Sequence, residues 1–317
     1  MQFLDAAALQ AALPFPALVA ALRRAFAAGA EVPQRHVHAI GDAGVSLLMP
    51  AWHAAAAGAG PAAAARYGVK IVNVFPGNAA RGLPGIHGVY ALFDAATGVP
   101  LAVLDGSELT ARRTAAVAAL AADFLARADA RSLLVVGAGR VGSIIPEAMR
   151  AVRPALREVT VWNRTPAAAE ALAARLRDQG FAAQATADLA AAVPRADIVS
   201  CATLAEAALV RGAWLAEGTH LDLIGSFAPA MREADGEAFA RCRVFVDTDE
   251  ALAKSGDVLQ AVAEGAWQPA ALQGTLARLC RGEATGRQGA AERTLFKSVG
   301  TALADLAAAE LVVDGPR

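Results

Sequence analysis

The chain has 317 residues, of which 56% are hydrophobic and 19% are charged, so it can bury the cores of two ordinary domains and is not disordered. Its net charge of −1 argues against a nucleic-acid-binding surface, because such surfaces carry a basic excess. The alanine-rich runs are too weakly apolar to span a bilayer, and the first residues lack a signal-peptide pattern. The three cysteines show neither the spacing of a zinc site nor that of a disulfide framework. We therefore expect a soluble cytoplasmic protein without nucleic-acid or membrane partners.

The first part of the chain has the pattern of an α+β unit. An amphipathic helix is predicted over 15–30, because Pro14 and Pro16 lie near its start and Gly29 near its end. Runs that favour strands follow at 35–40, 45–49, 68–75, 88–93 and 100–104. The turn at 95–98 indicates that the last two form a hairpin, so antiparallel pairing is expected here.

From residue 113 the pattern changes. A long helix rich in alanine and leucine is predicted over 113–128, and strands then alternate with helices. The candidate strands are 132–136, 158–162, 197–201, 220–224 and 243–246. This alternation predicts a parallel sheet with right-handed crossovers. A last long helix is expected over 291–311, packed back on the first domain.

The most specific motif is the segment 133–142, in which a short apolar strand leads into a G-x-G-x-x-G turn and a helix predicted over 143–152 follows. The first glycine would allow the tight turn, the second would let the backbone approach a pyrophosphate, and the third would let the helix pack on its strand. The helix N-terminus offers N–H groups and a positive dipole end to the phosphates. A structural strand–helix turn is the alternative, but the context favours a bound dinucleotide, with predicted contacts at Gly137, Gly139, Arg140, Val141 and Gly142.

The segment Asn163-Arg164-Thr165 after the second candidate strand predicts which dinucleotide binds. Domains that bind NAD usually carry an Asp or Glu here, which accepts the ribose 2′-OH. No carboxylate is present, and Arg164 can instead meet a 2′-phosphate with forked hydrogen bonds. NADPH is therefore the expected cofactor and NADH remains possible; the alternative is that Arg164 is only a solvated turn residue.

Several sequence blocks resemble a known family. They are Gly68-Val69-Lys70, Pro76-Gly77-Asn78, Phe93 to Gly98 and Arg113-Thr114-Ala115-Ala116. With the glycine turn downstream, the chain resembles the ornithine cyclodeaminase/mu-crystallin family over nearly its whole length. The resemblance implies an α/β protein with a Rossmann-type doubly wound parallel sheet over 118–290. It also implies an α+β substrate and dimerisation domain over 1–117, joined by the C-terminal helix 291–317, and hence a homodimer.

The resemblance also implies the substrate-binding residues. In the family, an arginine, the lysine of the G-x-K block and the arginine of the R-T-A-A block surround the substrate carboxylate, which places Arg35, Lys70 and Arg113 in these roles. Two guanidinium groups and an ammonium can pair with a carboxylate in a low dielectric. The alternatives are a structural ion pair for Lys70 and a solvent-facing position for Arg113, for which the adjacent Arg112 is easily mistaken. We also assign Thr203, Ser226, Lys297 and Ser298 to the cofactor site; the last two lie in a segment that resembles one near the nicotinamide and that is expected to begin the returning helix.

Phe227 separates the possible reactions. Relatives that deaminate ornithine carry an aspartate at the corresponding position, whereas a phenyl ring provides an apolar wall for a small ring. The segment 220–233 resembles that of the bacterial Δ1-pyrroline-2-carboxylate reductases. This implies NAD(P)H-dependent reduction of small cyclic ketimino acids, Δ1-pyrroline-2-carboxylate to L-proline and Δ1-piperideine-2-carboxylate to L-pipecolate. Lys70 is the candidate catalytic proton donor, since burial lowers the pKa of a lysine, or it only binds the carboxylate.

Other functions remain open. They are ornithine cyclodeamination, alanine or iminosuccinate chemistry, and non-catalytic binding of a small molecule together with NADPH. His36 and His38 share one strand face, but no third ligand is obvious, so no metal is expected. Arg232 and Glu233 are expected to form a local pair.

Overall fold

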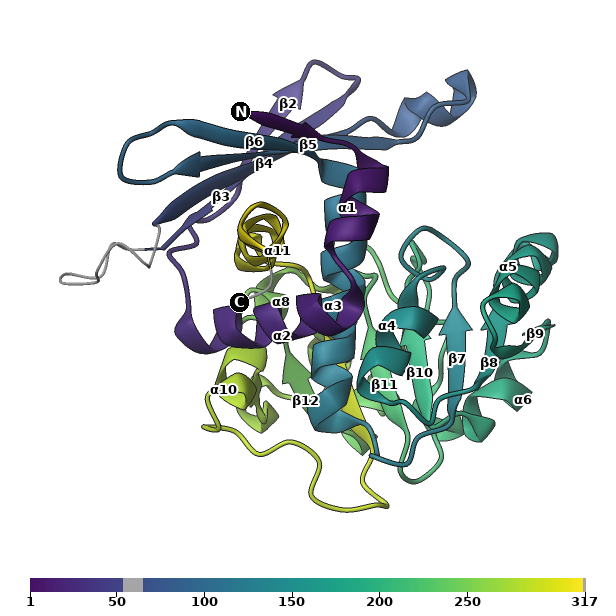
Figure 1. Cartoon of the computed structure of the whole chain (residues 1–317). Helices are drawn as coiled ribbons and strands as arrows, with labels where there is room; N and C mark the ends of the chain where they lie inside the picture. The colour runs from purple at the N-terminus through teal and green to yellow at the C-terminus, as the bar shows by residue number, and fades with distance from the viewer. Residues whose placement is uncertain (54–64, 316–317) are drawn as a thin grey trace. The chain divides into compact units, whose positions relative to one another are not determined.

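A computed structural model describes residues 1–53 and 65–315 (Figure 1). The chain divides into two compact units, Met1–Arg113 with Thr301–Arg317, and Thr114–Gly300. The sequence predicted the first boundary after residue 117, a few residues later than in the structure. It predicted the second after residue 290, ten residues earlier than in the structure. The first boundary falls inside helix α3 (Gly106–Leu125).

The first unit is built on a six-stranded sheet in the order β1-β6-β5-β4-β3-β2. Its strands are β1 (Gln2–Leu4), β2 (His36–Ile40), β3 (Gly44–Trp52), β4 (Arg66–Val74), β5 (Ile86–Asp94) and β6 (Pro100–Asp105). All pairings are antiparallel except that of β1 with β6, so the predicted α+β unit is confirmed. The hairpin predicted between β5 and β6 is present.

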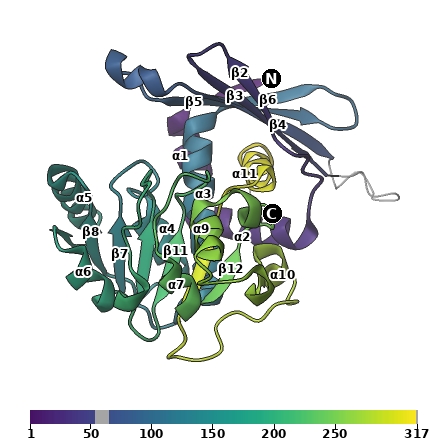
Figure 2. The same ribbon diagram turned by 180° about the vertical axis from the view of Figure 1, so that it is seen from behind.

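Helices pack in layers on one side of this sheet. They are α1 (Ala6–Ala12), α2 (Phe15–Ala28) and α11 (Ala302–Asp314), and a 3-10 turn (Pro76–Arg81) connects β4 to β5. Helix α11 contacts β3, β4 and β5 on one side and α2 on the other. Its coil lies between the sheet and α2 in both views of the unit (Figures 1 and 2). Side chains of β4 and β5 that face α11, such as Lys70 and Tyr90, are therefore withdrawn from water.

The second unit is a wholly parallel sheet of eight strands in the order β13-β12-β14-β11-β10-β7-β8-β9, which confirms the Rossmann-type fold. The strands are β7 (Ser132–Val136), β8 (Glu158–Trp162), β9 (Ala182–Thr186), β10 (Ile198–Cys201), β11 (His220–Leu223), β12 (Arg243–Val246), β13 (Gly274–Thr275) and β14 (Thr294–Lys297). The chain runs outward from β7 in both directions, so β7 and β10 flank the switch point at which such sheets bind ligands.

Short helices and turns connect these strands. The helices are α4 (Ile145–Val152), α5 (Pro166–Asp178), α6 (Leu189–Ala192), α7 (Gly236–Arg241), α8 (Ala251–Lys254), α9 (Gly256–Ala263) and α10 (Leu276–Cys280). Three 3-10 turns lie at Val193–Arg195, Gly212–Trp214 and Pro269–Ala271. Among the described residues, no single helix is long and apolar enough to cross a membrane, and only the bent pair of α1 and α2 passes by length and composition.

Two predicted helices need correction at their starts. Helix α3 begins at Gly106 and not at 113, because the Asp105 carboxylate accepts the Glu108 N–H at 2.7 Å and caps it. Helix α4 begins at Ile145 and not at 143, after a turn in which the Gly139 and Val141 carbonyls accept the first bonds.

The C-terminal segment differs more from the prediction, since 291–317 is not one helix. Residues Thr294–Lys297 form β14, which is completely buried and pairs with both β11 and β12. The Asp247 carboxylate then accepts the N–H groups of Val299 (3.0 Å) and Gly300 (2.7 Å), which keeps them out of a helix. Helix α11 starts only at Ala302, where the Thr301 side chain caps it.

Candidate active site

Lys70 lies in the middle of β4, on the sheet face that α11 covers. Its neighbours across the sheet are Met49 on β3 and Tyr90 on β5. Only 2% of the residue is exposed, and its ammonium lies 2.7 Å from the Asp305 carboxylate on α11. Burial lowers the pKa of Lys70 to about 8; the Asp305 charge opposes this shift, and the charges of Arg113 and Arg35 reinforce it. Lys70 is thus charged at neutral pH and can lose its proton in the range where enzymes work.

Arg113 on α3 reaches the same carboxylate from another element. Its Nε donates to Asp305 Oδ1 at 2.8 Å, and both residues are buried. Burial alone would raise the pKa of Asp305, but the charges of Arg113 and Lys70 outweigh it, and the pKa is lowered. Asp305 is therefore ionised, and the three groups together carry one positive charge. The alternative that Lys70 forms a structural ion pair is therefore correct in part, because its ammonium pairs with Asp305.

Asp305 was not identified from the sequence. It is completely buried in a helix whose other buried positions are alanine and leucine. A lone acidic residue in such a run is a signal for a buried partner, because charged side chains are almost never fully buried unless paired. This signal indicates a buried pair but does not identify the partners.

Arg35 and Arg112 have different surroundings, and only Arg35 lies near Lys70. Arg35, half-buried before β2, lies close enough to Lys70 for its charge to lower the lysine pKa. The structure thus brings together all three predicted carboxylate-binding cations. Arg112 instead donates to the Leu13 carbonyl at 2.9 and 2.7 Å and stacks over the Phe15 ring at 4.4 Å. Arg112 is a packing residue of the first unit.

Tyr90 explains the glycine of the G-x-K block. Its side chain is completely buried, and its hydroxyl has no hydrogen-bond partner among residues 1–53 and 65–315. A Cβ at Gly68 would lie 2.0 Å from that hydroxyl, so only glycine leaves room for it. Burial and the nearby Asp305 charge raise the pKa of Tyr90 well above its usual value, and the ring stays neutral beside Lys70.

The glycine turn lies at the carboxyl end of β7 in the second unit. Gly137 has φ +108°, and a Cβ there would lie 2.6 Å from the Ala202 carbonyl oxygen. A Cβ at Gly142 would lie 2.0 Å from the Gly137 oxygen. Nothing lies within 4 Å of the Cβ position of Gly139. The fold itself therefore requires the first and third glycines, whereas the second leaves an open space that fits the close approach of a pyrophosphate.

We expect Gly139→Ala to leave the unliganded protein stable and to weaken dinucleotide binding by about tenfold, because its methyl group meets only the ligand. Gly142→Ala is the matched substitution with the opposite result: its methyl group meets backbone, so the thermal midpoint should fall by roughly 5 °C. Thermal unfolding and cofactor fluorescence titration check both. A Gly139→Ala protein that binds the dinucleotide as wild type does would contradict the assignment.

Asn163 and Arg164 follow β8 at the same edge. The Asn163 side chain accepts the Ala138 N–H at 3.1 Å and donates to the Thr165 carbonyl at 3.1 Å, so it ties the glycine turn to this loop. Arg164 is exposed and makes no hydrogen bond or ion pair with the described parts of the chain. Its guanidinium is available to a ligand.

Other predicted cofactor residues lie at this edge, beyond the ends of β10, β11 and β14. Thr203 donates from N and Oγ1 to Glu233 at 2.7 and 2.8 Å. Ser226, with φ +53°, donates to the Met231 carbonyl at 2.7 Å and accepts the Asp257 N–H at 2.9 Å. Their side chains hold the loops in place, and their contact with a cofactor stays a prediction.

Lys297 ends β14 and has no exposed surface. Its ammonium contacts the Gly225 carbonyl and lies 3.3 Å from Asp257. Ser298 follows it and is buried, and contact of either residue with a cofactor also stays a prediction. Phe227, on the loop after β11, is 44% exposed.

The expected pair of Arg232 with Glu233 is wrong. Arg232 binds Glu264 through two nitrogens at 2.5 and 2.7 Å. Glu233 is completely buried against Thr203, and burial raises its pKa to about 7. Adjacent residues here point to opposite sides of the chain, one to the surface and one to the core.

Two cavities contain none of the predicted site residues. One of about 340 Å³ lies between α2 and α11 and includes His53 and Glu310. The other, of about 550 Å³, lies at the amino ends of β7, β8 and β9, at the opposite end of these strands from the glycine turn.

Within the described parts of the chain, no group of three or more His, Cys, Asp or Glu side chains is arranged to hold a metal. The rings of His36 and His38 stack at 6.4 Å.

Comparison with known proteins identifies the family. The model of the ornithine cyclodeaminase/mu-crystallin family matches residues 8–316. The chain belongs to this family. It is 43% identical over 247 residues to Δ1-pyrroline-2-carboxylate reductase of Paracoccus denitrificans, covering 78% of each chain. It is 39% identical over 284 residues to the protein SAR DEFICIENT 4 of Arabidopsis thaliana, covering 88% of this chain and 86% of the other.

Solved structures of the family share the whole fold. The structure of Thermococcus litoralis Δ1-pyrroline-2-carboxylate reductase, in complex with NADH and L-proline, superposes with a TM-score of 0.91 at 30% identity and covers 99% of this chain and 97% of that one. An archaeal alanine dehydrogenase dimer with bound NAD gives 0.88 at 26% identity, covering 99% and 95%. The family, the fold and the oxidoreductase class predicted from the sequence are thereby confirmed.

Proposed function

We propose that this member of the family is an NADPH-dependent reductase of small cyclic ketimino acids, which converts Δ1-pyrroline-2-carboxylate to L-proline and Δ1-piperideine-2-carboxylate to L-pipecolate. The observation that carries the proposal is the joint burial of Lys70 and Arg113 on one internal carboxylate, with donors left over for a second. The reductases among its relatives support the choice of substrate.

The cations can hold the substrate by its carboxylate. Asp305 occupies one donor of Lys70 and one of Arg113, and the cluster retains one positive charge. A substrate carboxylate would neutralise that charge in a low dielectric, where charge-assisted bonds are strongest. Arg35 adds positive potential from nearby. Contact of the exposed Phe227 ring with the substrate stays a prediction from the sequence.

Reduction adds a hydride to the imine carbon and a proton to the imine nitrogen. The nicotinamide, when bound, supplies the hydride and becomes oxidised. Lys70, with a pKa of about 8, can supply the proton because it is charged at neutral pH yet readily loses the charge. The Lys70–Asp305 contact holds the ammonium in place as it gives up the proton.

We propose that the cofactor is NADPH in preference to NADH, on the basis of the exposed Arg164 and the absence of a carboxylate after β8. Arg164→Ala should raise the dissociation constant for NADPH roughly 10- to 100-fold, as expected for lost bonds to a charged phosphate, and leave that for NADH nearly unchanged. Fluorescence titration with both dinucleotides measures the two constants. A wild-type protein that clearly prefers NADH would rule out the assignment.

A homodimer is also proposed, because the sheet face opposite to Lys70 is apolar. One row across five strands contains Pro50, Val69, Ala91, Val103 and Phe3. Phe3 is 74% and Val89, in the next row, 44% exposed. A second copy would cover this face. Light scattering should give twice the chain mass, and a monomer would refute the proposal.

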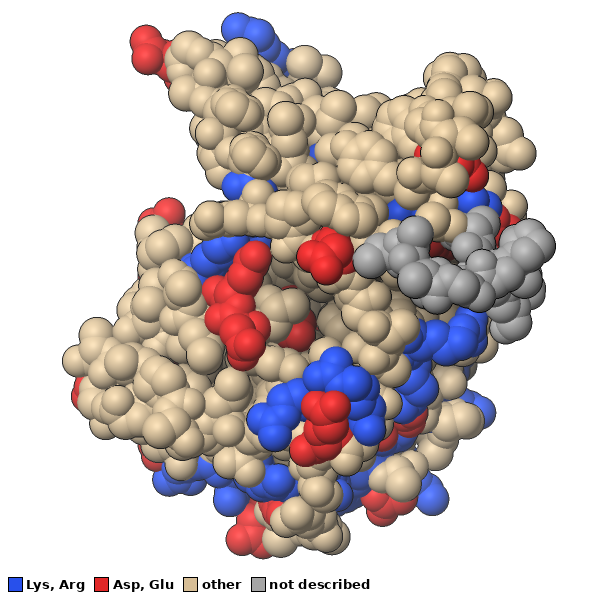
Figure 3. Space-filling view, turned by 90° about the vertical axis from the view of Figure 1, so that its left-hand side faces the viewer, with Lys and Arg blue, Asp and Glu red and all other residues tan. Residues whose placement is uncertain are grey.

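On the molecular face shown in Figure 3, acidic and basic side chains are intermixed.

The function is tested by initial rates of NADPH oxidation with a panel of substrates. Δ1-pyrroline-2-carboxylate and Δ1-piperideine-2-carboxylate should be reduced much faster than pyruvate or oxaloacetate with ammonia, which test the alanine and iminosuccinate alternatives. Ammonia release from ornithine tests the cyclodeaminase alternative. Tight NADPH binding without turnover of any imine would favour a carrier and overturn the proposal.

A further inference from the structure

Asp305 is the one acidic side chain in contact with both Lys70 and Arg113 among the residues described. It lies on α11, whereas its partners lie on β4 and α3. The three side chains are almost or completely buried, so none of them is a surface ion pair screened by solvent.

Stability alone does not account for this cluster. Taking charges out of water costs several kcal/mol per ion, and well-packed apolar side chains often serve as well or better. The cluster also leaves one positive charge uncompensated inside the first unit, which is a cost to folding. Such an arrangement is expected where charge is needed for a ligand.

The donors that remain on the two cations show what Asp305 leaves free. Of the five N–H donors of Arg113, the Nε donor is used on Asp305, and neither Nη nitrogen has a partner among the described residues. The Lys70 ammonium has three donors and, within the same residues, Asp305 as its only ion-pair partner. Asp305 thus fixes both cations while leaving the fork of Arg113 for another anion.

Resting on the proposed function, we propose that Asp305 is a positioning residue for the reduction: it orients Lys70 and Arg113 toward the substrate carboxylate and keeps Lys70 charged.

The charges around Lys70 show why it would need this help. Burial, Arg113 on α3 and Arg35 before β2 all lower the pKa of Lys70, and Asp305 on α11 opposes them. Tyr90 on β5 stays neutral and cannot replace the acid. Without Asp305 the pKa of Lys70 falls further, and at neutral pH the side chain would lose its charge, its grip on the substrate and its proton.

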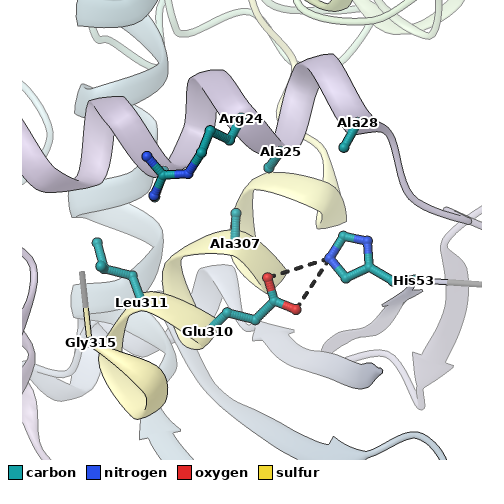
Figure 4. A pocket seen from close by; sticks show the side chains of 9 residues that line it. Arg24, Ala25, Ala28, His53, Ala307, Glu310, Leu311 and Gly315 are labelled. Carbon is teal, nitrogen blue, oxygen red and sulfur yellow. Dashed lines mark hydrogen bonds and ion pairs between the residues drawn. The ribbon is translucent and has the colours of Figure 1, made fainter. Parts of the chain in front are cut away.

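The test compares Asp305→Asn with Glu310→Gln, an isosteric change on the same helix. Glu310 lies 3.2 Å from His53 and lines the cavity beside α2 (Figure 4). It is not among the groups whose charges shift the pKa of Lys70. A protonated donor gives activity below its pKa that is lost above it, so the basic limb of kcat/KM in the wild type is expected near pH 8. In Asp305→Asn this limb should move about one pH unit or more toward acid, and in Glu310→Gln it should not move.

A second readout does not depend on activity. The chain has only three lysines, Lys70, Lys254 and Lys297, so the Cε signals of protein labelled with ¹³C-lysine can be followed singly by NMR. The Lys70 signal, assigned with Lys70→Arg, should titrate near pH 8 in the wild type and at lower pH in Asp305→Asn. If the wild type reduces no imine, the proposed function fails, while this titration still tests whether Asp305 keeps Lys70 charged.

Asp305→Glu extends the test if the Asn variant does not fold. Glutamate keeps the negative charge but shifts its position, so Lys70 should titrate as in the wild type. Lys70 and Arg113 would be displaced with it, and KM for the imine should rise about tenfold. An unmoved limb and an unmoved Lys70 titration in Asp305→Asn would overturn the proposal. A wild-type KM in Asp305→Glu would overturn the positioning role in the same way.

Discussion

Replacing Lys70 with Met should reduce kcat/KM for Δ1-pyrroline-2-carboxylate about 1,000-fold or more at neutral pH, since general acid catalysis alone contributes 10²- to 10⁴-fold. The substitution removes the proposed proton donor and one of the cations that bind the carboxylate. It also leaves Asp305 with Arg113 alone, so the positive charge of the cluster is lost. Steady-state rates over a range of imine concentrations measure the effect.

The chain provides a matched control for this change. Lys254 pairs with Glu250 one turn earlier on the surface, and Lys254→Met should keep wild-type kinetics. Cofactor titration should give the same dissociation constant in both variants, because Lys70 belongs to the first unit and the glycine turn to the second. Near-normal turnover by a folded Lys70→Met protein would remove Lys70 from the site. Lys70→Arg separates its two roles, because an arginine can bind the carboxylate but does not give up a proton.

Replacing Arg113 with Ala should raise KM for the imine and lower kcat/KM about 100-fold or more, because a paired guanidinium in a buried site is worth several kcal/mol. Lys70 and Asp305 would then neutralise each other, and only the positive potential of Arg35 would remain of the three predicted cations to attract the substrate. The loss should be larger in KM than in kcat, since Arg113 is not proposed to transfer a proton. Initial rates at saturating cofactor separate the two constants.

Arg112→Ala is the contrasting variant. It loses two hydrogen bonds to the Leu13 carbonyl and the contact with Phe15, so it should lower the free energy of unfolding by about 1–3 kcal/mol. Its folded fraction should turn over the imine as the wild type does. If Arg112→Ala lost activity while Arg113→Ala kept it, the two arginines would have been assigned the wrong way round.

The sequence predicted the central strands of the parallel sheet well. Strands β7, β8 and β12 coincide with the predicted ranges 132–136, 158–162 and 243–246. They are short runs rich in apolar and β-branched residues between helices, a local pattern that favours strands. Strand β9 was missed because its sequence Ala-Ala-Gln-Ala-Thr lacks this composition, and only pairing with β8 makes it a strand.

Strand β14 was assigned to the C-terminal helix for a different reason. Its four residues adjoin an alanine-rich helix, and only their place between β11 and β12 makes them a strand. The Asp247 side chain accepts the N–H groups that follow β14, those of Val299 and Gly300. These residues lie 52 and 53 positions away from Asp247 in the sequence. A helical period cannot reveal such contacts.

The sequence predicted the basic residues of the site but not the acidic residue that pairs with them. Lys70 and Arg113 lie in motifs that identify a family, whereas Asp305 is 192 residues from Arg113 in the chain. Its pairing with both cations is a tertiary contact without a local pattern. The same limit explains Arg232, whose partner Glu264 lies 32 residues away and not next to it.

The most direct test of the account is the fate of the hydride. Wild-type protein is incubated with Δ1-pyrroline-2-carboxylate and NADPH that carries deuterium at both positions of nicotinamide C4, and the product is analysed by mass spectrometry. We expect L-proline with a single deuterium, bound to the α-carbon. Proline without deuterium, deuterium at another carbon, or no proline at all would contradict it.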